Sequence, residues 1–456
     1  MIKKLTKLVG LKKNDFDAFV QSGNIHLSPA RLIPVLKVGD EMALTSIILS
    51  SLRLIKEFRD VFFSETQISR AGRIYYFTEA VFKDIDSESR IDGLIIVVVG
   101  GVIKDAAILE MKNKNNSVDA PQLQRYISLA SKLKIKKIIT ISNQFVAHPS
   151  LSPVNVRVPK SISLLHFSWT YLQTIAHLLL FKNDTNIVDE DQIELMREVL
   201  FYLENKVSGV VGYSQMKSGW NTVVENINSQ KKLKMSDAFV EEAVVSWEEE
   251  ERDMALMLSR ELGVMVKSSI ARNKAQLKDK LKRDIKSLVT KHKLESSLMI
   301  RGSVSDVGVI AEFDTRTIIM SVRTQPPLDR GVKARIGWII RQIENFEKKN
   351  PELFNQISKE LWIEGDVKFS SNNIRIKYSN IESLYDYTDK DIYAFNILYI
   401  KDLGKGFSSP RKFVEKIEKM LLDYYQCVVQ YLTKWSPPPP KIESKKTESV
   451  QDKDVN

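Results

Sequence analysis

The alternation of apolar and polar positions predicts a mixed α/β region in the first half of the chain. From Asp40 the stretch DEMALTSIILSSLRLIKEFRDVFF has apolar residues at helical spacing, which predicts one long amphipathic helix with Asp40 as its cap. Apolar runs that predict strands follow at RIYYFTEAVF, DGLIIVVV, AAILEMK, KIKKIITISN and SISLLHFSW. A helix is predicted over residues 119–133, between the third and fourth of these runs, and another from Thr170.

The order of these elements predicts the domain organisation. An α/β domain with a mixed sheet flanked by helices is predicted over residues 39–205. Its elements are, in order, a helix, three strands, a helix, two strands and a last helix. Residues 1–38 form an N-terminal extension with short helix and loop signals. Residues 206–435 combine helical and β-hairpin patterns, which predicts an α+β accessory region. The tail 436–456 has no apolar periodicity and is predicted to be disordered.

Two charged stretches of the accessory region each have two interpretations. The acidic run in SWEEEERDMALMLSRELG predicts a solvated helix face, and contact with a basic protein surface is the alternative. The stretch PPLDRGVKARIGWIIRQ carries Arg330, Lys333, Arg335 and Arg341 around an apolar helix with Trp338. It is either a basic patch for nucleic acid or an acidic partner, or an amphipathic helix with a solvated basic face. The second interpretation is favoured.

Composition and charge restrict the class of protein. The apolar fraction of 43% is that of an ordinary globular protein, and the longest apolar runs are too short or too interrupted by polar residues to span a bilayer. The basic amino terminus lacks an apolar h-region, so we expect no secretory signal, a cytoplasmic location and no membrane partner. The single cysteine, Cys427, excludes an intramolecular disulfide framework and a Cys-based zinc site. The net charge of +11 fits a polyanionic partner and a merely lysine-rich composition equally well.

The chemistry of the chain is concentrated around the LEMK stretch. Glu110 and Lys112 lie two residues apart in a predicted strand, so they project from the same face. Gly100 and Gly101 predict a tight turn, and an antiparallel hairpin around them places Asp92 within a position or two of Glu110. Two carboxylates and a lysine then converge at one end of the hairpin.

Two neighbouring carboxylates repel each other unless a cation lies between them. Magnesium prefers such oxygen ligands and often joins one or two carboxylates to phosphate oxygens, and the backbone carbonyl of Met111 offers a further ligand. Lys112 beside the ion could orient an attacking water or stabilise charge that develops on phosphorus. These groups suit hydrolysis of a phosphodiester. The alternative is a solvated Glu–Lys pair of little energetic value, but Glu110 and Lys112 end a run that begins AAIL, where a solvated face would alternate from its start.

The predicted helix that follows adds polar groups beside this site. In SVDAPQLQRY, Asp119 is the expected N-cap, and Gln122 and Tyr126 lie four residues apart on one helix face. A capping box of Asp119 and Gln122 would be sufficient reason for the glutamine, but it would not account for Tyr126 or Arg125. A helix start presents free N–H groups, so these three side chains suit contact with a phosphate backbone.

The ordered set RIDG, LEMK and QLQRY resembles the PD-(D/E)xK nuclease superfamily, and in particular its RecB-like branch. The resemblance covers about residues 35–205 and implies a restriction-endonuclease-like mixed sheet flanked by helices. It implies that Asp92 and Glu110 bind Mg²⁺ or Mn²⁺, that Lys112 assists the attacking water, and that Gln122 and Tyr126 position metal or substrate. Ile91 stands where the motif's name has proline, which members of the superfamily tolerate.

Many members of the superfamily carry another acid on the first core helix. The resemblance implies that this acid is Glu41, near the start of the helix predicted from Asp40, with Glu79 on the next strand as the rival position. A glutamate in a first helical turn also interacts favourably with the helix dipole without any catalytic role.

These patterns support three functional hypotheses. The first is a metal-dependent nuclease whose C-terminal region binds substrate or a protein partner; DNA is the expected substrate because the RecB-like branch mostly acts on it, and RNA is the alternative. The second keeps the nuclease-like fold in a catalytically inactive nucleic-acid-binding or assembly protein. The third is an interaction scaffold in which the resemblance is accidental. The first is favoured because every motif position holds a chemically competent residue.

Overall fold

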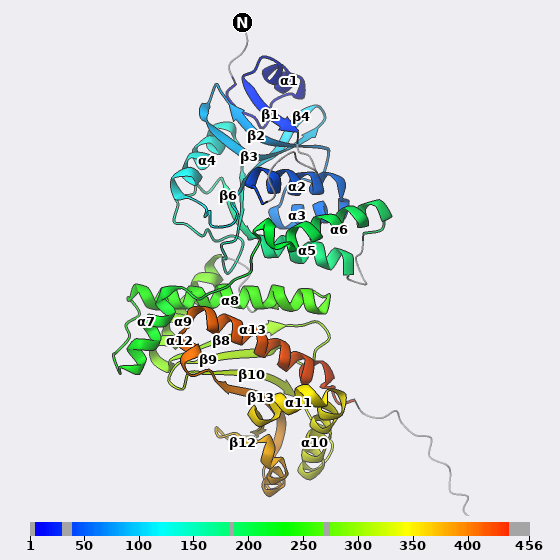
Figure 1. The fold of residues 1–456 in the computed structure, drawn as a ribbon, viewed down its shortest axis with the longest axis vertical. Coiled ribbons are helices and arrows are strands. Elements are labelled where there is room, and N and C mark those ends of the chain that lie inside the picture. The colour runs from blue at the N-terminus through cyan, green and yellow to red at the C-terminus, as the bar shows by residue number, and fades with distance from the viewer. Residues whose placement is uncertain (1–4, 30–38, 182–186, 269–273, 437–456) are drawn as a thin grey trace, which may run out of the picture.

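The computed structural model describes residues 5–29, 39–181, 187–268 and 274–436, which form two sheets with their covering helices (Figure 1). The first sheet lies in the body nearer the amino terminus. The elements of this body are α1 (Lys13–Gln21), β1 (Ile25–Pro29), α2 (Glu41–Leu54), α3 (Lys56–Thr66), β2 (Arg73–Phe82), β3 (Asp86–Val99), β4 (Val102–Met111), α4 (Ala120–Leu133), β5 (Lys137–Ser142), β6 (Ser163–Ser168), α5 (Trp169–Phe181) and α6 (Glu190–Glu204).

The first sheet is mixed, with its strands in the order β1-β2-β3-β4-β5-β6. Strands β1 to β4 pair in antiparallel fashion, whereas β4, β5 and β6 are parallel and α4 connects β4 to β5. The predicted mixed α/β architecture is therefore confirmed. Strand β1, within the segment expected as an extension, pairs with β2 at the sheet edge.

Helices pack against both faces of the first sheet through apolar side chains. Helices α2, α3, α5 and α6 pack on one face, which includes Leu109 and Met111 of β4. Helices α1 and α4 pack on the other face, which includes Ile108. Because successive strand residues alternate between faces, Glu110 lies on the α4 face of the sheet.

The prediction of one long helix from Asp40 is wrong, because the chain leaves the helical conformation at Ile55. Its φ and ψ are −110° and 106°, which ends α2 and begins α3. The Ile55 side chain is completely buried and packs in the same core cluster as Phe58 and Phe62 of α3. The sequence has no glycine or proline here, so the helical pattern carried no sign of the break.

The predicted hairpin around Gly100 and Gly101 is confirmed. These two residues have φ of 58° and 73°, the left-handed conformation that a two-residue hairpin turn requires and that glycine adopts without strain. Val99 pairs with Val102 beside the turn, but farther along the strands the register shifts by one residue, with Lys104 as the extra residue of a β-bulge. Gly93 then pairs with Leu109, so position 92 lies opposite position 110.

The second sheet is antiparallel and has the strand order β12-β11-β13-β10-β9-β8-β7. The elements of this body are α7 (Ser218–Asn228), α8 (Ala238–Leu262), β7 (Lys267–Ser268), α9 (Lys274–Lys291), β8 (Lys293–Met299), β9 (Val307–Glu312), β10 (Thr317–Thr324), α10 (Val332–Lys349), α11 (Pro351–Ile357), β11 (Leu361–Val367), β12 (Ile374–Lys377), β13 (Ile392–Asp402), α12 (Lys405–Ser408) and α13 (Pro410–Cys427). The tail that was predicted to be disordered lies, from residue 437 onward, outside the described residues.

Helix α8 lies on the side of the second body that faces the first body (Figure 1). It belongs to the core around the second sheet and also contacts α5 of the first body. Arg260 of α8 donates a hydrogen bond of 2.8 Å to Thr174 of α5, and the guanidinium of Arg252 lies 5.4 Å from the ring centroid of Tyr171. In the part of the chain that the structure describes, no helix combines the length and apolar character needed to cross a bilayer.

The predicted solvated acidic face on α8 is wrong, because this face is buried. Five acidic side chains are at most 5% exposed, namely Glu248, Glu249, Glu250, Glu251 and Asp253. Cations from distant elements compensate most of them: Lys280 Nζ lies 3.5 Å from Glu248 and 3.4 Å from Glu251, and Lys217 Nζ lies 2.5 Å from Glu249. The oxygens of Glu250 have no hydrogen-bond partner among the residues that the structure describes. Burial, followed by the charges of Glu418 and Asp253, raises the pKa of Glu250 well above the usual value.

The buried Glu250 predicts a pH-dependent stability. A carboxyl whose pKa is raised in the folded state is favourable when protonated, so its contribution is present below about pH 4.5 and is lost as the pH rises. We expect Glu250→Gln to raise the free energy of unfolding relative to the wild type, and to raise it by more at pH 8 than at pH 5. Urea unfolding at both pH values measures the difference. Glu241→Gln, at an exposed position of the same helix, is the control, and an equal response of both variants would contradict the burial effect.

Candidate active site

Asp92 of β3 and Glu110 of β4 lie side by side on the hairpin, where the shifted register places them opposite each other. Glu110 is 2% exposed, and Asp92 Oδ2 accepts a hydrogen bond of 3.1 Å from the backbone N–H of Met111. Burial, together with the neighbouring Glu110 charge, raises the pKa of Asp92 to about 8. Two carboxyl groups are thus held close together in a site where a second negative charge is unfavourable.

Lys112 provides the cation closest to these acids. Its Nζ lies 2.7 Å from Glu110 Oε1 and 3.7 Å from Glu41 Oε2. The backbone on either side of the side chain is fixed, since the Lys112 N–H donates to Ile141 and its carbonyl accepts from Trp169 Nε1, both at 2.8 Å. Burial alone would lower the pKa of Lys112, but the hydrogen bond to Glu110 and the charges of the three acids outweigh it and raise the pKa.

Glu41 reaches the site from the first turn of α2. Asp40 caps this helix, with its carboxylate accepting from the backbone N–H of Met42 at 2.9 Å. Glu41 Oε1 accepts hydrogen bonds from the backbone N–H of Asn113 at 3.2 Å and from Asn116 Nδ2 at 2.7 Å. Glu41 therefore joins the start of α2 to the loop that follows β4.

The rival acid, Glu79, lies on β2 and has a different partner. Its Oε2 is 2.8 Å from Arg90 Nε, and its φ of 55° marks an irregular position in the strand. Among the described residues, the ion pairs of Glu79 do not include Lys112, whereas those of Glu41 do. Lys112 is thus ion-paired with Glu41 and not with Glu79, although the β2–β3 register places position 79 opposite Asp92.

Helix α4 covers the carboxyl pair, with Asp119 as its N-cap as predicted. Tyr126 is 2% exposed, and its hydroxyl donates a hydrogen bond of 2.6 Å to the carbonyl of Arg90, two residues before Asp92. Burial and then the Glu110 charge raise its pKa. Gln122 Nε2 donates to the Tyr126 hydroxyl at 3.3 Å. Gln122 and Tyr126 therefore lie at the site, whereas Arg125 is exposed and makes none of these contacts.

Two buried polar side chains that the sequence did not predict, Thr140 and His166, lie in line with Glu110 on the next two strands of the sheet. Glu110 pairs with Thr140 of β5, and Thr140 pairs with His166 of β6. His166 Nδ1 lies 2.8 Å from Thr140 Oγ1, and Nε2 lies 2.8 Å from the carbonyl of Gln144, so Nε2 carries the proton. Burial lowers the pKa of His166 to about 4. The signal in the sequence was an isolated polar residue within each of two apolar strands.

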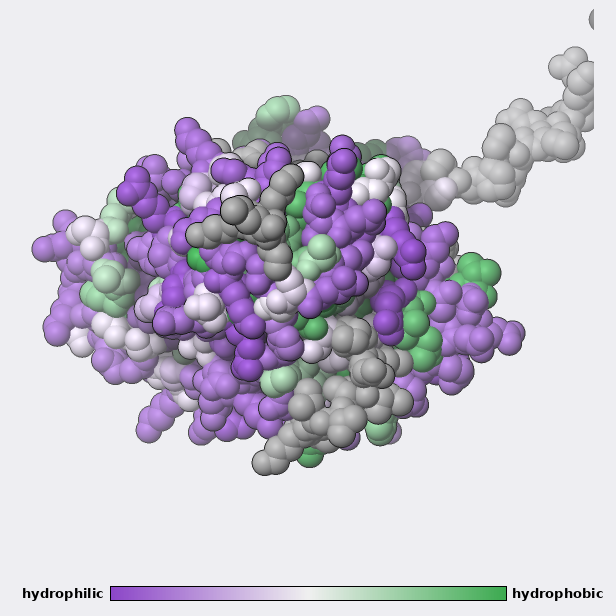
Figure 2. All heavy atoms as spheres, turned by 90° about the horizontal axis from the view of Figure 1, so that it is seen from above, coloured by the Kyte–Doolittle hydropathy of each residue, from purple (hydrophilic) through white to green (hydrophobic). Residues whose placement is uncertain are grey.

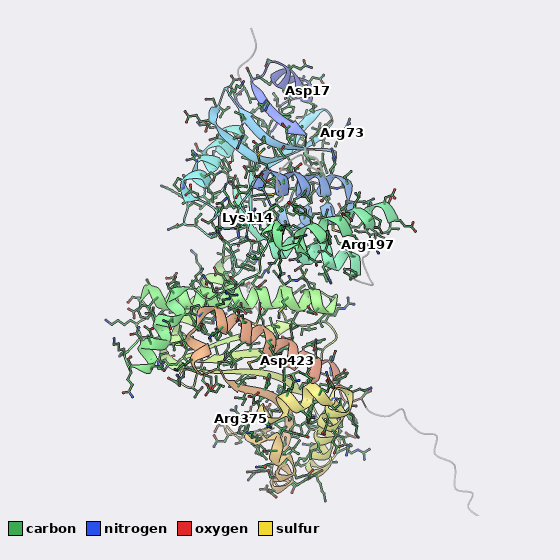
Figure 3. The ribbon with its side chains drawn as sticks, viewed as in Figure 1. Asp17, Arg73, Lys114, Arg197, Arg375 and Asp423 are labelled. Atoms are coloured by element: carbon green, nitrogen blue, oxygen red, sulfur yellow. The ribbon has the colours of Figure 1, made fainter. Side chains whose placement is uncertain are left out.

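Asn113 was also missed and holds the loop after Lys112 in place. It is 1% exposed, and its Nδ2 donates to the carbonyl of Gly39 at 3.0 Å. Its backbone N–H contacts Glu41, so one residue links the loop to the start of α2. Figure 3 shows the neighbouring Lys114 on the side of the first body that faces the second body. A polar residue directly after a strand was the available sequence signal.

The residues at the site fit a divalent cation. Glu110 is buried, and Lys112 Nζ lies 2.7 Å from its Oε1. Apart from this contact, no well-formed hydrogen bond to the Glu110 oxygens is found among the described residues. Asp92 and Glu110 offer the hard oxygen donors that magnesium and manganese prefer, and the Met111 carbonyl is adjacent. Within the described residues, however, no three His, Cys, Asp or Glu side chains form a preassembled metal cluster.

The structure brings together six of the predicted side chains, namely Asp92, Glu110, Lys112, Glu41, Gln122 and Tyr126. They come from α2, the β3–β4 hairpin and α4, and α4 and the hairpin are adjacent in sequence. Their interpretation depends on this geometry alone, because the chain matches no known family model, no curated protein and no solved structure.

Proposed function

We propose that this chain is a cytoplasmic, metal-dependent nuclease of the PD-(D/E)xK superfamily with a restriction-endonuclease-like catalytic domain. The observation that carries the proposal is the convergence of Asp92, Glu110 and Lys112 at one end of the β3–β4 hairpin, with Lys112 Nζ 2.7 Å from Glu110. The succession of α2, three antiparallel strands, α4 and a parallel strand supports the same assignment.

Hydrolysis of a phosphodiester requires an activated water and stabilisation of the negative charge that develops on the phosphate. Asp92 and Glu110 would hold Mg²⁺ or Mn²⁺ with the Met111 carbonyl, and a bound ion of this kind supplies positive charge and favours ionisation of a water. Lys112 remains protonated beside Glu110, so its ammonium can donate a hydrogen bond to a phosphate oxygen or to the attacking water. Glu110 and Glu41 keep the ammonium in place.

Tyr126 and Gln122 position the helix that borders this chemistry. The Tyr126 hydroxyl is already used in holding α4 against β3, so we assign it a positioning role. The Gln122 amide is partly exposed and can reach toward a phosphate. DNA is the proposed substrate, with RNA as the alternative.

The proposal is tested by incubating the purified full-length chain with supercoiled, linear and single-stranded DNA and with RNA. Each substrate is supplied with Mg²⁺, Mn²⁺ or EDTA. We expect cleavage of at least one DNA form in either metal and none in EDTA. Cleavage that persists in EDTA, or absence of cleavage of every substrate in both metals, would contradict a metal-dependent nuclease.

A catalytically inactive nucleic-acid-binding protein is the second candidate, and the position of Lys112 favours it. The ammonium lies between Glu110 and Glu41 and balances their charge without a metal ion. Such a protein would bind nucleic acid in a salt-dependent manner and would leave it intact under all metal conditions. The same incubation, followed by a gel-shift measurement of the uncut DNA, distinguishes the two candidates.

A further inference from the structure

Positive charge is concentrated in one helix of the second body. Seven of the eighteen residues of α9 are lysine or arginine and two are aspartate, a net charge of +5 in a chain whose total is +11. Helix α9 lies beside α8, on the same side of the second body as α7 and α12 (Figure 1). The face seen from above in Figure 2, coloured by hydropathy, is largely hydrophilic with small apolar areas between the polar side chains.

One face of α9 is occupied by its packing against the second body. Leu277, Ile285 and Leu288 of this face are buried. Lys280, which is 6% exposed, also lies here and neutralises Glu248 and Glu251 of α8. These contacts fix the rotation of the helix about its axis, and therefore determine which of its residues face solvent.

The opposite face of α9 presents four exposed cations, namely Lys278, Lys282, Arg283 and Lys286. Within the part of the chain that the structure describes, none of the four forms an ion pair. Some exposed cations of other helices are paired with an acid one turn away, as Arg411 is with Glu415. The cationic row of α9 is thus free to neutralise charge on another molecule.

The alternative basic stretch, on α10, is used inside the protein. Arg335 donates from Nη1 to Asp391 and to the carbonyl of Ile392, and its side chain is 13% exposed. Arg330 lies 3.5 Å from Asp329. Two of the four cations of this stretch are therefore engaged within the protein. By contrast, none of the four exposed cations of α9 is ion-paired among the described residues.

We infer that the exposed face of α9 binds the phosphate backbone of a nucleic acid. This inference rests on the proposed function for the choice of nucleic acid among polyanions. Lys278, Lys282 and Lys286 recur every four residues, so they lie about 6 Å apart along the helix axis. The row spans about 12 Å, over which one strand of a duplex presents three to four phosphates.

The chemistry of the same face argues against a membrane surface as the occupant. A helix that lies on a bilayer inserts an apolar face between the lipid headgroups. The apolar face of α9 is already buried in the protein core, and among the described residues of α9 no large apolar side chain is exposed. The surface offers charge without apolar anchors, as expected of backbone binding without base recognition.

The test compares two triple variants with equal loss of charge. K278A/K282A/K286A removes the row on α9, and K348A/K349A/K359A removes three lysines that are also exposed, on and after α10. Binding of a fluorescent DNA duplex is followed by anisotropy in EDTA, so that turnover does not interfere. We expect the α9 variant to bind about tenfold more weakly at ~100 mM salt and its slope of log K against log salt to fall by about 2 to 3 units. The control variant should bind like the wild type.

Several outcomes would overturn the inference. These are equal binding by the α9 variant and the wild type, equal loss in both triple variants, absence of binding by the wild type at low salt, and binding of anionic vesicles in place of DNA. Since the titration contains EDTA, its result is separate from that of the cleavage assay. Metal-dependent cleavage with unaltered binding by the α9 variant would leave the nuclease proposal intact and remove only this surface.

Discussion

Lys112→Ala is expected to lower the rate of metal-dependent DNA cleavage by about a hundredfold to a thousandfold, because it removes the ammonium that lies within 2.7 Å of Glu110. The loss should appear at saturating DNA, since Lys112 acts on the reacting phosphate and contributes little to overall binding. Single-turnover cleavage of a labelled DNA, with excess protein, measures the rate directly.

The same substitution leaves Glu110 buried without its cation, so folding must be measured together with activity. Lys112→Gln retains a hydrogen-bond donor without the charge and should show a similar loss of rate with less effect on stability. Lys114→Ala is the control, because Lys114 lies two residues away and is exposed. Wild-type rates in both folded Lys112 variants would exclude the proposed role of the ammonium.

Glu110→Gln is expected to abolish stabilisation of the protein by divalent metal. A ligand that binds only the folded state at about a hundred times its dissociation constant raises the free energy of unfolding by about 2.7 kcal/mol. We expect the wild type to gain an increment of this size as Mn²⁺ is titrated, and the variant to gain less than about 1 kcal/mol. Thermal unfolding across the titration provides the measurement and does not depend on nuclease activity.

Glu79→Gln provides the matched control for this experiment. Glu79 is paired with Arg90, so its substitution should leave the response to Mn²⁺ unchanged. Without metal, Glu110→Gln should be at least as stable as the wild type at pH 8, because the substitution removes the charge that helps to raise the pKa of Asp92. A full Mn²⁺ response in Glu110→Gln, or its loss in Glu79→Gln, would contradict the assignment of Glu110 as a ligand.

The hairpin and its charged end could be predicted because they depend on local rules. The side chains of Glu110 and Lys112 share a face as a consequence of the two-residue period of a strand. Gly100 and Gly101 specify a tight turn between two apolar runs, and together these rules placed Asp92 within a position or two of Glu110. Asp119 likewise marked the start of α4 by its capping chemistry.

The features that the sequence did not predict depend on partners far away in the chain. The acidic run on α8 is buried because Lys217 and Lys280, from two other elements, supply compensating charge. The Thr140–His166 contact requires β5 and β6 to be parallel neighbours in one particular register. Ile55 leaves the helical conformation in a core formed by several helices. Helical or strand periodicity within a short window contains none of this information.

The β-bulge at Lys104 links the spacing of the two acids to the shape of the hairpin. A regular hairpin with a two-residue turn pairs positions whose separation is odd, as Val99 and Val102 show, whereas Asp92 and Glu110 are separated by an even number. Without the extra residue, position 92 would be paired with Leu109 and its side chain would share that residue's face of the sheet, away from Glu110. The difference in residue number between the two acids must therefore stay even if they are to remain on the same face. An insertion of one residue in one strand would have to be matched by an insertion of one residue in its partner.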